Sequence, residues 1–345
     1  MSGSGNRTVE FRRETRNLFF HILTACNLRC RHCYINRARH GANSLDASAI
    51  KEWLEIFAKH TRSGSRFLKE VSLPEKSNVI FLGGEPTMHP DLPFAIEEAR
   101  RLGYGSVTVD TNGYLFNNIL EKTSPDLVDF FSFSLDGSRP EVNDPIRGEG
   151  SFDACTEGIK RAVKLGFNAS SIFTAHRMNL HDLENMPELL ASLGVRRFFI
   201  QVIGIRGNPA MNHDESLQLG RKEWEAVVPD VARKAASLGM RVTYPAVFLE
   251  RDERFECAGV VADNYFVFPN GRVYTCPLCE DLDLHAFEIR EGRLVKRPPV
   301  TEADLYTLSI DEGCVMNRIL HPGNIEYENG RPLNRIACCM LKKEL

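Results

Sequence analysis

Short apolar runs and amphipathic segments alternate along the first two thirds of the chain. Apolar residues recur at helical spacing at Ile50, Trp53, Leu54 and Phe57. The same spacing predicts helices over residues 47–58, 92–102, 152–165 and 183–192. Apolar runs typical of buried strands lie before and between these helices, at 17–23, 78–82, 106–110, 127–134, 169–174 and 197–203. Six strands alternating with helices predict an α/β fold with a parallel sheet, a partial or complete barrel with its function on the loops after the strands.

The pattern changes after residue 207. A helix is predicted over 222–238, with a kink or break at Pro229. Farther on, the apolar segments 265–268 and 272–275 flank an Asn-Gly dipeptide, which is typical of a β-hairpin turn. We therefore expect four parts: an N-terminal tail over 1–15, a barrel over 16–207, a linker helix and connecting segment over 208–250, and a small irregular cysteine-rich extension with a β-hairpin over 251–345.

Composition narrows the possible classes of function. The chain has 345 residues, of which 43% are hydrophobic and 26% charged, and its formal net charge is −3. These values are ordinary for a globular protein and do not favour a nucleic acid as partner. No apolar run reaches the roughly 18–20 residues that a membrane helix needs. The polar segment 1–16 does not resemble a signal peptide, so a cytoplasmic protein is expected.

The ten cysteines are distributed unevenly. Without an export signal, cysteines bind metal or take part in chemistry more often than they form disulfides. Cys155 stands alone in the middle of the chain. The other nine fall into an N-terminal group and a C-terminal group: Cys26, Cys30 and Cys33, and then Cys257, Cys276, Cys279, Cys314, Cys338 and Cys339. This distribution predicts two metal regions on either side of a cysteine-poor scaffold.

The first motif is Cys26-Asn-Leu-Arg-Cys30-Arg-His-Cys33, directly after the first strand. Three thiolates so close together in one loop can bind one face of an iron–sulfur cluster. A four-iron cluster held by three cysteines leaves one iron free for an exogenous ligand. The alternatives are a structural zinc loop or three cysteines that are buried for unrelated reasons.

Polar motifs follow the next three strands. In Gly83-Gly84-Glu85-Pro86, the glycines allow close approach of a ligand and offer amide donors, and the Glu85 carboxylate suits an ammonium group. Each motif alone is ordinary turn chemistry, but all of them fall at the same mouth of the predicted sheet. The later two, which suit a ribose or an amino-acid carboxyl group, are Thr111-Asn112-Gly113 and Ser132-Phe-Ser134-Leu-Asp136.

Together these motifs resemble the radical S-adenosylmethionine (radical SAM) family. Cys26, Cys30, His32 and Cys33 fill its Cys-x3-Cys-x-aromatic-Cys signature, with His32 at the ring position near the adenine. The resemblance covers residues 16–205 and implies a partial (βα)6 TIM-type barrel with a [4Fe–4S] cluster. It also implies that SAM is bound by a further set of residues: Gly83, Gly84, Glu85, Asn112, Ser134 and Asp136.

The C-terminal cysteines continue the resemblance. Cys257-x13-Gly271-x4-Cys276 is similar to the opening of the SPASM/twitch extension, which carries auxiliary [4Fe–4S] clusters in part of the family. The dense cysteine run of a full SPASM domain is missing, so one auxiliary cluster is implied. Its expected ligands are Cys257, Cys276, Cys279 and Cys314, with Cys338 or Cys339 as a replacement for one of the last two. The alternative is a structural zinc knot.

The resemblance implies an oxygen-sensitive enzyme that cleaves SAM reductively to a 5′-deoxyadenosyl radical and abstracts hydrogen from a substrate. A small-molecule substrate is favoured, and maturation of a peptide or protein side chain is the alternative. A non-catalytic iron–sulfur electron carrier is less favoured. The final residues, 338–345, lack the glycine-rich tail of molybdopterin-pathway members, which disfavours that assignment. The expected reductant is a flavodoxin or ferredoxin.

Several single residues have weaker signals. His21, His176, Asn179 and Gln201 lie in or just after predicted strands, where each suits contact with SAM or substrate as well as a structural role. Arg147 is interpreted as part of a turn. No catalytic acid, base or radical relay is assigned from the sequence.

Overall fold

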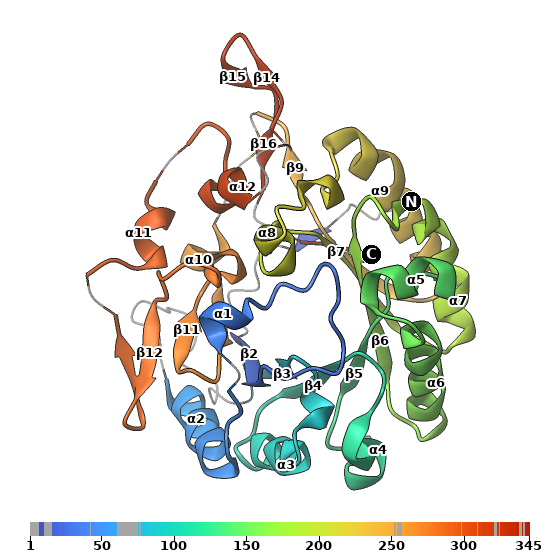
Figure 1. Cartoon of the computed structure of the whole chain (residues 1–345), viewed down its shortest axis with the longest axis vertical. Helices are drawn as coiled ribbons and strands as arrows, with labels where there is room; N and C mark the ends of the chain where they lie inside the picture. Colours follow the sequence, from blue (N-terminus) through green and yellow to red (C-terminus); the bar gives the residue numbers. More distant parts are fainter. Residues whose placement is uncertain are drawn as a thin grey trace.

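The computed structural model describes residues 7–9, 16–41, 43–60, 75, 77–251, 253, 257–297, 299–308, 310–320, 323, 325–337, 340 and 342–345. Its centre is a parallel sheet curved around a central space, with helices on the outside (Figure 1). Neighbouring strands pair in chain order. The strands are β2 (Arg16–Leu23), β3 (Ser77–Gly83), β4 (Ser106–Thr111), β5 (Phe130–Ser134), β6 (Ala169–Ala175), β7 (Arg197–Val202) and β8 (Arg241–Pro245).

This arrangement confirms the expected parallel α/β barrel and shows that it is partial. The sheet has two ends and does not close on itself within the described residues. The strands carry apolar side chains on their outer face, such as Phe131 and Phe133 of β5, and these are fully buried against the helices. The inner face carries polar side chains at the carboxyl ends of the strands, which positions the candidate site.

The outer helices form where amphipathic segments were expected. In α2 (Ala47–Lys59), Asp46 caps the helix by accepting a hydrogen bond from the Ala49 amide, and Ile50, Leu54 and Phe57 are buried on one face. The remaining helices of the barrel are α1 (Arg37–His40), α3 (Leu92–Arg101), α4 (Ile119–Lys122), α5 (Pro140–Arg147), α6 (Ser151–Lys164), α7 (Met186–Ser192), α8 (Asn208–Met211) and α9 (Arg221–Ser237).

Segment 208–250 differs from the expected linker. It contains α9 and β8, and β8 pairs in parallel with β7, so the segment extends the barrel by one more helix–strand unit. The expected break at Pro229 is wrong, because α9 runs through this residue without interruption. Pro229 deprives the Glu225 carbonyl of its helical donor, but Glu225 is exposed and water can replace that donor.

The C-terminal extension completes both edges of the barrel sheet. On one edge, β10 (Asp263–Val267) pairs in parallel with β2, and a buried ion pair of 3.0 Å joins Arg16 to Asp263. The expected hairpin is confirmed: β10 turns into β11 (Arg272–Tyr274), followed by β12 (Phe287–Arg290) and β13 (Arg293–Lys296). On the other edge, β17 (Lys342–Glu344) pairs with β8 and with β1 (Arg7–Val9). The extension is therefore hydrogen bonded to the barrel at both edges.

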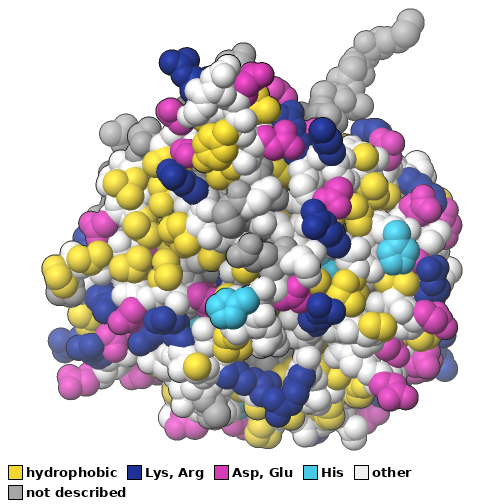
Figure 2. Space-filling model, turned by 45° about the horizontal axis from the view of Figure 1, so that its top comes forward, with side chains coloured by type: hydrophobic (Ala, Val, Ile, Leu, Met, Phe, Trp, Pro, Cys, Tyr) yellow, Lys and Arg dark blue, Asp and Glu magenta, His cyan; other side chains and the backbone are white. Residues whose placement is uncertain are grey.

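The rest of the extension consists of short elements around a second, smaller core. Large apolar side chains remain exposed on it, among them Val260, Leu308 and Ile319, and Figure 2 shows apolar side chains gathered on that side of the molecule. No helix in the described ranges has the length and apolarity to cross a membrane. The remaining elements are α10 (Ala258–Val261), α11 (Glu302–Tyr306), α12 (Val315–Leu320), β9 (Phe248–Leu249), β14 (Tyr327–Glu328), β15 (Arg331–Pro332) and β16 (Arg335–Ile336).

Candidate functional site

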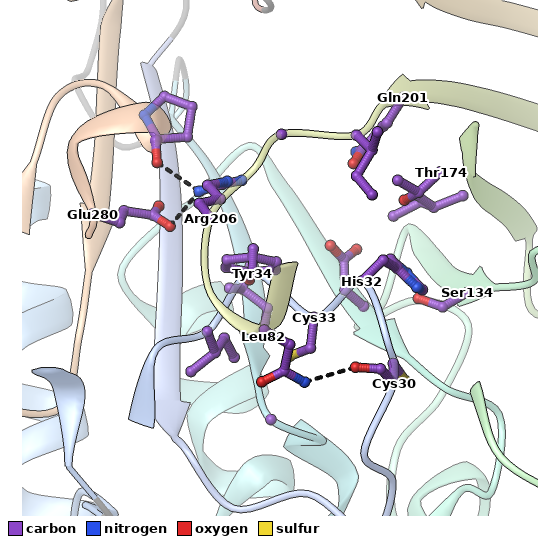
Figure 3. A pocket seen from close by; sticks show the side chains of 18 of the residues that line it. Cys30, His32, Cys33, Tyr34, Leu82, Ser134, Thr174, Gln201, Arg206 and Glu280 are labelled. Carbon is purple, nitrogen blue, oxygen red and sulfur yellow. Dashed lines mark hydrogen bonds and ion pairs between the residues drawn. The ribbon is translucent and has the colours of Figure 1, made fainter. Parts of the chain in front are cut away.

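A cavity of about 550 Å³ lies at the carboxyl ends of the barrel strands. Its wall is built from the loop of the first cysteine motif, the turns after β3, β4 and β5, and the extension. Figure 3 shows side chains from these separate segments pointing toward a common space. Motifs that are far apart in the sequence thus meet at one place, as their common position after strands predicts.

The three N-terminal cysteines all line this cavity. Burial raises the pKa of Cys26 and Cys33, and it raises the pKa of Cys30 to about 12. The charges of Cys26 and Cys33 also raise the pKa of Cys30. The guanidinium of Arg147 has the opposite effect on the pKa of Cys30. Three neighbouring thiols that face a cavity, with a cation nearby, fit a [4Fe–4S] cluster with one iron open to the cavity.

A zinc loop is the alternative to a cluster at these cysteines. In the described parts of the chain, no three side chains of the metal-ligating types lie close enough together to hold one ion. Metal analysis of the reconstituted protein separates a [4Fe–4S] cluster from the zinc loop considered in the sequence.

The glycine pair after β3 serves packing within the chain. A Cβ atom on Gly84 would lie 2.0 Å from the Ala25 carbonyl oxygen, and one on Gly83 would lie 2.3 Å from that of Leu23. The amides of Gly84 and Glu85 donate hydrogen bonds to these same carbonyls, at 3.1 Å and 2.9 Å. The expected amide donors are thus used by the strand end that leads to Cys26, and the glycines set the position of the cysteine loop.

Glu85 is fully buried and its carboxylate accepts four hydrogen bonds from the protein. Oε1 accepts from the Thr87 amide at 3.1 Å, from the Thr87 hydroxyl at 2.6 Å and from the Thr111 hydroxyl at 2.8 Å. Oε2 accepts from the Asn112 amide at 2.6 Å. Burial raises the pKa of Glu85, and these donors oppose that rise. The side chain therefore joins the turns after β3 and β4 while also lining the cavity.

Asp136 holds two other side chains of the site. Its Oδ2 lies 2.6 Å from Arg147 Nε and 3.2 Å from His32 Nε2. Burial raises the pKa of Asp136, but the charge of Arg147 and its other partners outweigh burial and lower it. Burial lowers the pKa of His32 to about 3, so its ring is neutral. Asp136 is fully buried behind His32 and Arg147, which line the cavity in its place.

Asn112 and Ser134 lie where the sequence placed them, on the cavity wall. The Asn112 side-chain amide donates to Asn27 Oδ1 at 2.7 Å and approaches Cys26 Sγ at 3.8 Å. Asn112 therefore links the turn after β4 to the cysteine loop. The Cys155 thiol approaches the Ser134 backbone carbonyl at 3.6 Å, and the Ser134 side chain lies on the cavity side (Figure 3).

The segment after β7 connects the cysteine loop to the extension. Asn208 donates from its side chain to the Cys30 carbonyl and from its backbone to the Cys33 carbonyl, both at 2.8 Å. Arg206 donates to the Glu280 carboxylate at 2.7 Å and lies 4.7 Å from the ring centre of Tyr34 (Figure 3). This connection was missed in the sequence, because nothing in the spacing of these residues indicates it.

Three of the C-terminal cysteines come together in the small core of the extension. Cys276, Cys279 and Cys314 are buried there side by side. A hydrogen bond with Cys276 lowers the pKa of Cys279. Burial and neighbouring charges, including that of Cys314, raise this pKa by more, so the net shift is upward. Cys257 is only half-buried and precedes α10. Cys338 and Cys339 lie outside the described residues.

A buried carboxyl group accompanies these cysteines. Glu302 accepts hydrogen bonds from the Thr275 hydroxyl at 2.9 Å and from the Cys276 amide at 3.3 Å. Tyr306 lies one turn after Glu302 on α11. Its phenol ring packs against Gly259 of α10, two residues after Cys257. The charges of Cys276 and Cys279 reach Tyr306 and help raise its pKa, after burial as the main cause. Tyr306 thus places α10 next to the cysteine group. Neither Glu302 nor Tyr306 was identified from the sequence.

Of the residues with weaker sequence signals, some have a structural role and others line the cavity. Asn179 is buried and bonds the backbone of β6, and His176 lies 5.7 Å from His32, ring centre to ring centre. His21 and Gln201 line the cavity, and His21 hydrogen bonds the Tyr34 hydroxyl at 2.9 Å. Arg147, interpreted as a turn residue, is instead part of the cavity wall. Asp110 and Lys342 also line the cavity and were not identified from the sequence.

Comparison with curated proteins gives several enzymes. The chain is 30% identical over 207 residues to "Fe-coproporphyrin III synthase" of Methanosarcina barkeri, covering 59% of this chain and 48% of that protein. It is 28% identical over 199 residues to a "Probable GTP 3',8-cyclase" of Methanocaldococcus jannaschii, covering 57% and 62%. A protein of the same name from Saccharolobus solfataricus is 24% identical over 313 residues, covering 88% and 96%. The chain thus spans less than two thirds of the first two relatives.

Solved structures share the fold. The crystal structure of Streptococcus suis SuiB bound to precursor peptide SuiA aligns with a TM-score of 0.64 at 15% identity, covering 89% of this chain and 73% of that one. The structure of anSMEcpe with bound AdoMet aligns with a TM-score of 0.54 at 12% identity, covering 76% and 71%. At such low identity the likeness supports the partial barrel and nothing beyond the fold.

The family model of the "Radical SAM superfamily" matches residues 21–193. This span runs from β2, before the cysteine loop, to the end of α7, and it contains the cysteine loop and the turns after β3, β4 and β5. Members of this family are enzymes that use a [4Fe–4S] cluster and SAM. The chain belongs to the radical SAM superfamily.

Proposed function

We propose that the protein is a radical SAM enzyme that cleaves SAM reductively and uses the radical to abstract hydrogen from a small molecule. The observation that carries this proposal is the convergence of Cys26, Cys30 and Cys33 with the turns after β3, β4 and β5 on one cavity. When bound, the cluster and SAM supply the electron and the 5′-deoxyadenosyl radical. The protein binds and orients them and keeps water out.

The cavity residues divide into ligands and positioning residues. Cys26, Cys30 and Cys33 hold the cluster. Glu85, at the cavity wall, accepts a hydrogen bond from the SAM ammonium at Oε2, which among the described residues accepts from the Asn112 amide and offers a second lone pair. His32 packs near the adenine, while Asp136 keeps its ring in place. Further contacts to SAM come from the side chains of Asn112 and Ser134 and from the backbone of Gly83 and Gly84, apart from the Gly84 amide, which already donates to the Leu23 carbonyl.

The extension holds one auxiliary [4Fe–4S] cluster in this proposal. Cys276, Cys279 and Cys314 share one buried core, which suits a cluster ligated by thiolates. Cys257 is the fourth ligand proposed. Its support is the packing of Gly259 against Tyr306, which brings α10 close to the other three cysteines. A zinc knot is the competing occupant, and metal analysis separates the two.

Relatives and structural neighbours do not agree on one substrate. Their names point to a coproporphyrin, to GTP and to a precursor peptide. A small molecule is proposed here because the cavity is enclosed on one side by the extension, with Leu278 and Met340 on its wall. Modification of a peptide is the second candidate, favoured by the alignment with SuiB over most of this chain. The proposed partner is a reductant such as a flavodoxin or ferredoxin, in the cytoplasm.

The test is reductive cleavage of SAM by the anaerobically reconstituted protein. With dithionite and SAM, the wild type is expected to form 5′-deoxyadenosine. The triple variant with alanine at Cys26, Cys30 and Cys33 is expected to form none, yet to keep the iron of the extension. Cys155→Ala is the control for loss of a buried thiol, because Cys155 lies beneath the turns after β4 and β5, beside Gly113 and the Ser134 carbonyl, but does not line the cavity. Product formation by the triple variant would show that the assignment is wrong.

A further inference from the structure

The inner part of the cavity contains charged side chains to which the proposed function assigns no role in binding the cluster or SAM. Asp110 is on β4 and precedes Asn112, just after the strand, by two residues. Both side chains therefore face the barrel interior, with Asp110 about 6–7 Å deeper. Ser132 lies opposite Asp110 on β5 and hydrogen bonds its carboxyl group. Asp110 is therefore an acid fixed below the SAM residues, where a substrate would lie.

A cation reaches the same region from the extension. Lys342 is on β17, opposite Pro245 of β8, and its side chain lines the cavity. Its ammonium nitrogen lies 5.8 Å from the centre of the Phe199 ring on the inner face of β7. Asp110 and Lys342 line the same cavity, and the Lys342 ammonium opposes the effect of burial, which raises the pKa of Asp110 to about 7.

The surroundings of this pair combine two polar side chains with an apolar wall. Thr174 and Gln201 pair across β6 and β7 and point into the cavity beside Ser134 (Figure 3). Apolar side chains complete the lining, among them Phe19, Ile172, Ile200, Phe266, Leu278 and Met340. Here an acid and a cation lie beside an apolar wall, and a ligand that carries both complementary charges gives each of them a charge-assisted hydrogen bond.

We propose that Asp110 and Lys342 form a subsite for a free α-amino acid. The Asp110 carboxylate accepts hydrogen bonds from the ammonium of this substrate, and the Lys342 ammonium donates to its carboxylate. The amino-acid side chain then extends along the apolar wall toward the cysteine loop, where hydrogen abstraction takes place. The subsite rests on the proposed function for its role in catalysis, but ligand binding to it is measurable without catalysis.

The test is calorimetric titration of the reconstituted protein with the twenty standard amino acids, anaerobically and with SAM at saturation. Saturation keeps the methionine end of SAM from serving as the ligand. At least one amino acid is expected to bind. Its analogues without the amino group or without the carboxyl group are expected to bind about ten- to a hundredfold more weakly, the usual effect of losing one charge-assisted hydrogen bond.

Two variants assign these losses to the two side chains. Asp110→Asn lacks the proposed partner of the ammonium group, so it is expected to bind the amino acid and its deaminated analogue about equally. Lys342→Gln lacks the proposed partner of the carboxylate, so it is expected to bind the amino acid and its decarboxylated analogue about equally. Asp126→Asn and Lys343→Gln are matched controls: Asp126 is exposed, and Lys343 points away from Lys342 on β17. Both controls are expected to bind like the wild type.

The outcomes are decisive in either direction. The subsite is wrong if no amino acid binds, or if Asp110→Asn and Lys342→Gln bind like the controls. It is also wrong if both variants only lower the melting temperature, since the pair would then serve to attach β17. 5′-Deoxyadenosine formation is measured on the same preparations. Its absence in the wild type would contradict the proposed function, whereas its presence in both variants, with amino-acid binding lost, supports the subsite.

Discussion

Arg206 and Glu280 form an ion pair of 2.7 Å between the segment after β7 and the extension. Glu280 is almost completely buried, and Arg206 is mostly buried. The same guanidinium donates to the Pro277 carbonyl, close to Cys276 and Cys279 in the chain. Two residues after Arg206, the chain bonds the carbonyls of the N-terminal cysteine loop. One short segment thus holds both cysteine regions in a fixed relation.

Replacing Arg206 with glutamine is expected to loosen this connection. Burial raises the pKa of Glu280 to about 8, so the variant loses a buried hydrogen bond to this carboxyl group, which typically costs about 1–3 kcal/mol of the free energy of unfolding. The measurement is denaturant unfolding, with limited proteolysis to locate cleavage after residue 250. Arg233→Gln is the matched control, since it breaks an exposed pair with Asp230 and should change stability by less than about 1 kcal/mol. Equal stability of the two variants would contradict the role of Arg206.

The close approach at Gly84 leads to a second prediction. Gly84→Ala would place a Cβ atom 2.0 Å from the Ala25 carbonyl oxygen, so the segment leading to Cys26 must move. We expect the variant to lose most of the iron of the N-terminal cluster and about 2 kcal/mol or more of stability. Iron analysis and thermal unfolding measure the two effects. Gly220→Ala is the control, because its Cβ would meet only Glu223 at 3.4 Å; full iron content in Gly84→Ala would contradict the prediction.

Glu85→Gln is expected to have two separate effects. The new side-chain amide would face hydrogen-bond donors such as the Asn112 amide, which should lower stability by about 1–3 kcal/mol. Loss of the charge should weaken SAM binding by about one to two decades, without loss of iron. Thr111→Val distinguishes the effects, because it removes one hydrogen bond to Glu85 and keeps the carboxylate. If Thr111→Val weakens SAM binding as much, Glu85 has no direct role in holding SAM.

Cys276→Ala tests the occupant of the extension. The wild type is expected to contain about eight irons, two clusters of four, and the variant about half of that. Since metal binding is coupled to folding, protease sensitivity after residue 250 should rise as well. Cys155→Ala should retain all the iron. Stoichiometric zinc in the wild type, together with only four irons, would instead identify a zinc knot.

The fold was largely predictable because most of its signals are local. The apolar strands and the amphipathic helices reveal the barrel, and Asn270 with Gly271 reveals the hairpin. The strand β8 was not predicted, since Arg241–Pro245 is short and follows a helix that contains Pro229. Its assignment to the sheet depends on pairing with β7 and β17, which local sequence does not encode.

The site was predictable only as far as its residues stand in motifs. The cysteine loop and the turns after β3 to β5 have characteristic spacing, and the structure brings them together. Arg206, Glu280 and Lys342 belong to no motif, and their positions follow from contacts between distant segments. The role of Asp136 is similar in kind: the sequence placed it near SAM, while the fold puts Arg147 and His32 in front of it.

The pairing of β2 with β10 has a consequence for the order of folding. Arg16 and Asp263 meet across 247 positions of the chain, whereas the units from β3 to β8 each need only neighbouring segments. Closing so long a loop is entropically costly, so the local units should assemble first and the two sheet edges last. Until then the edges of β2 and β8 are open to pairing with other chains. Misfolded oligomers of this protein should therefore be joined through these two strands.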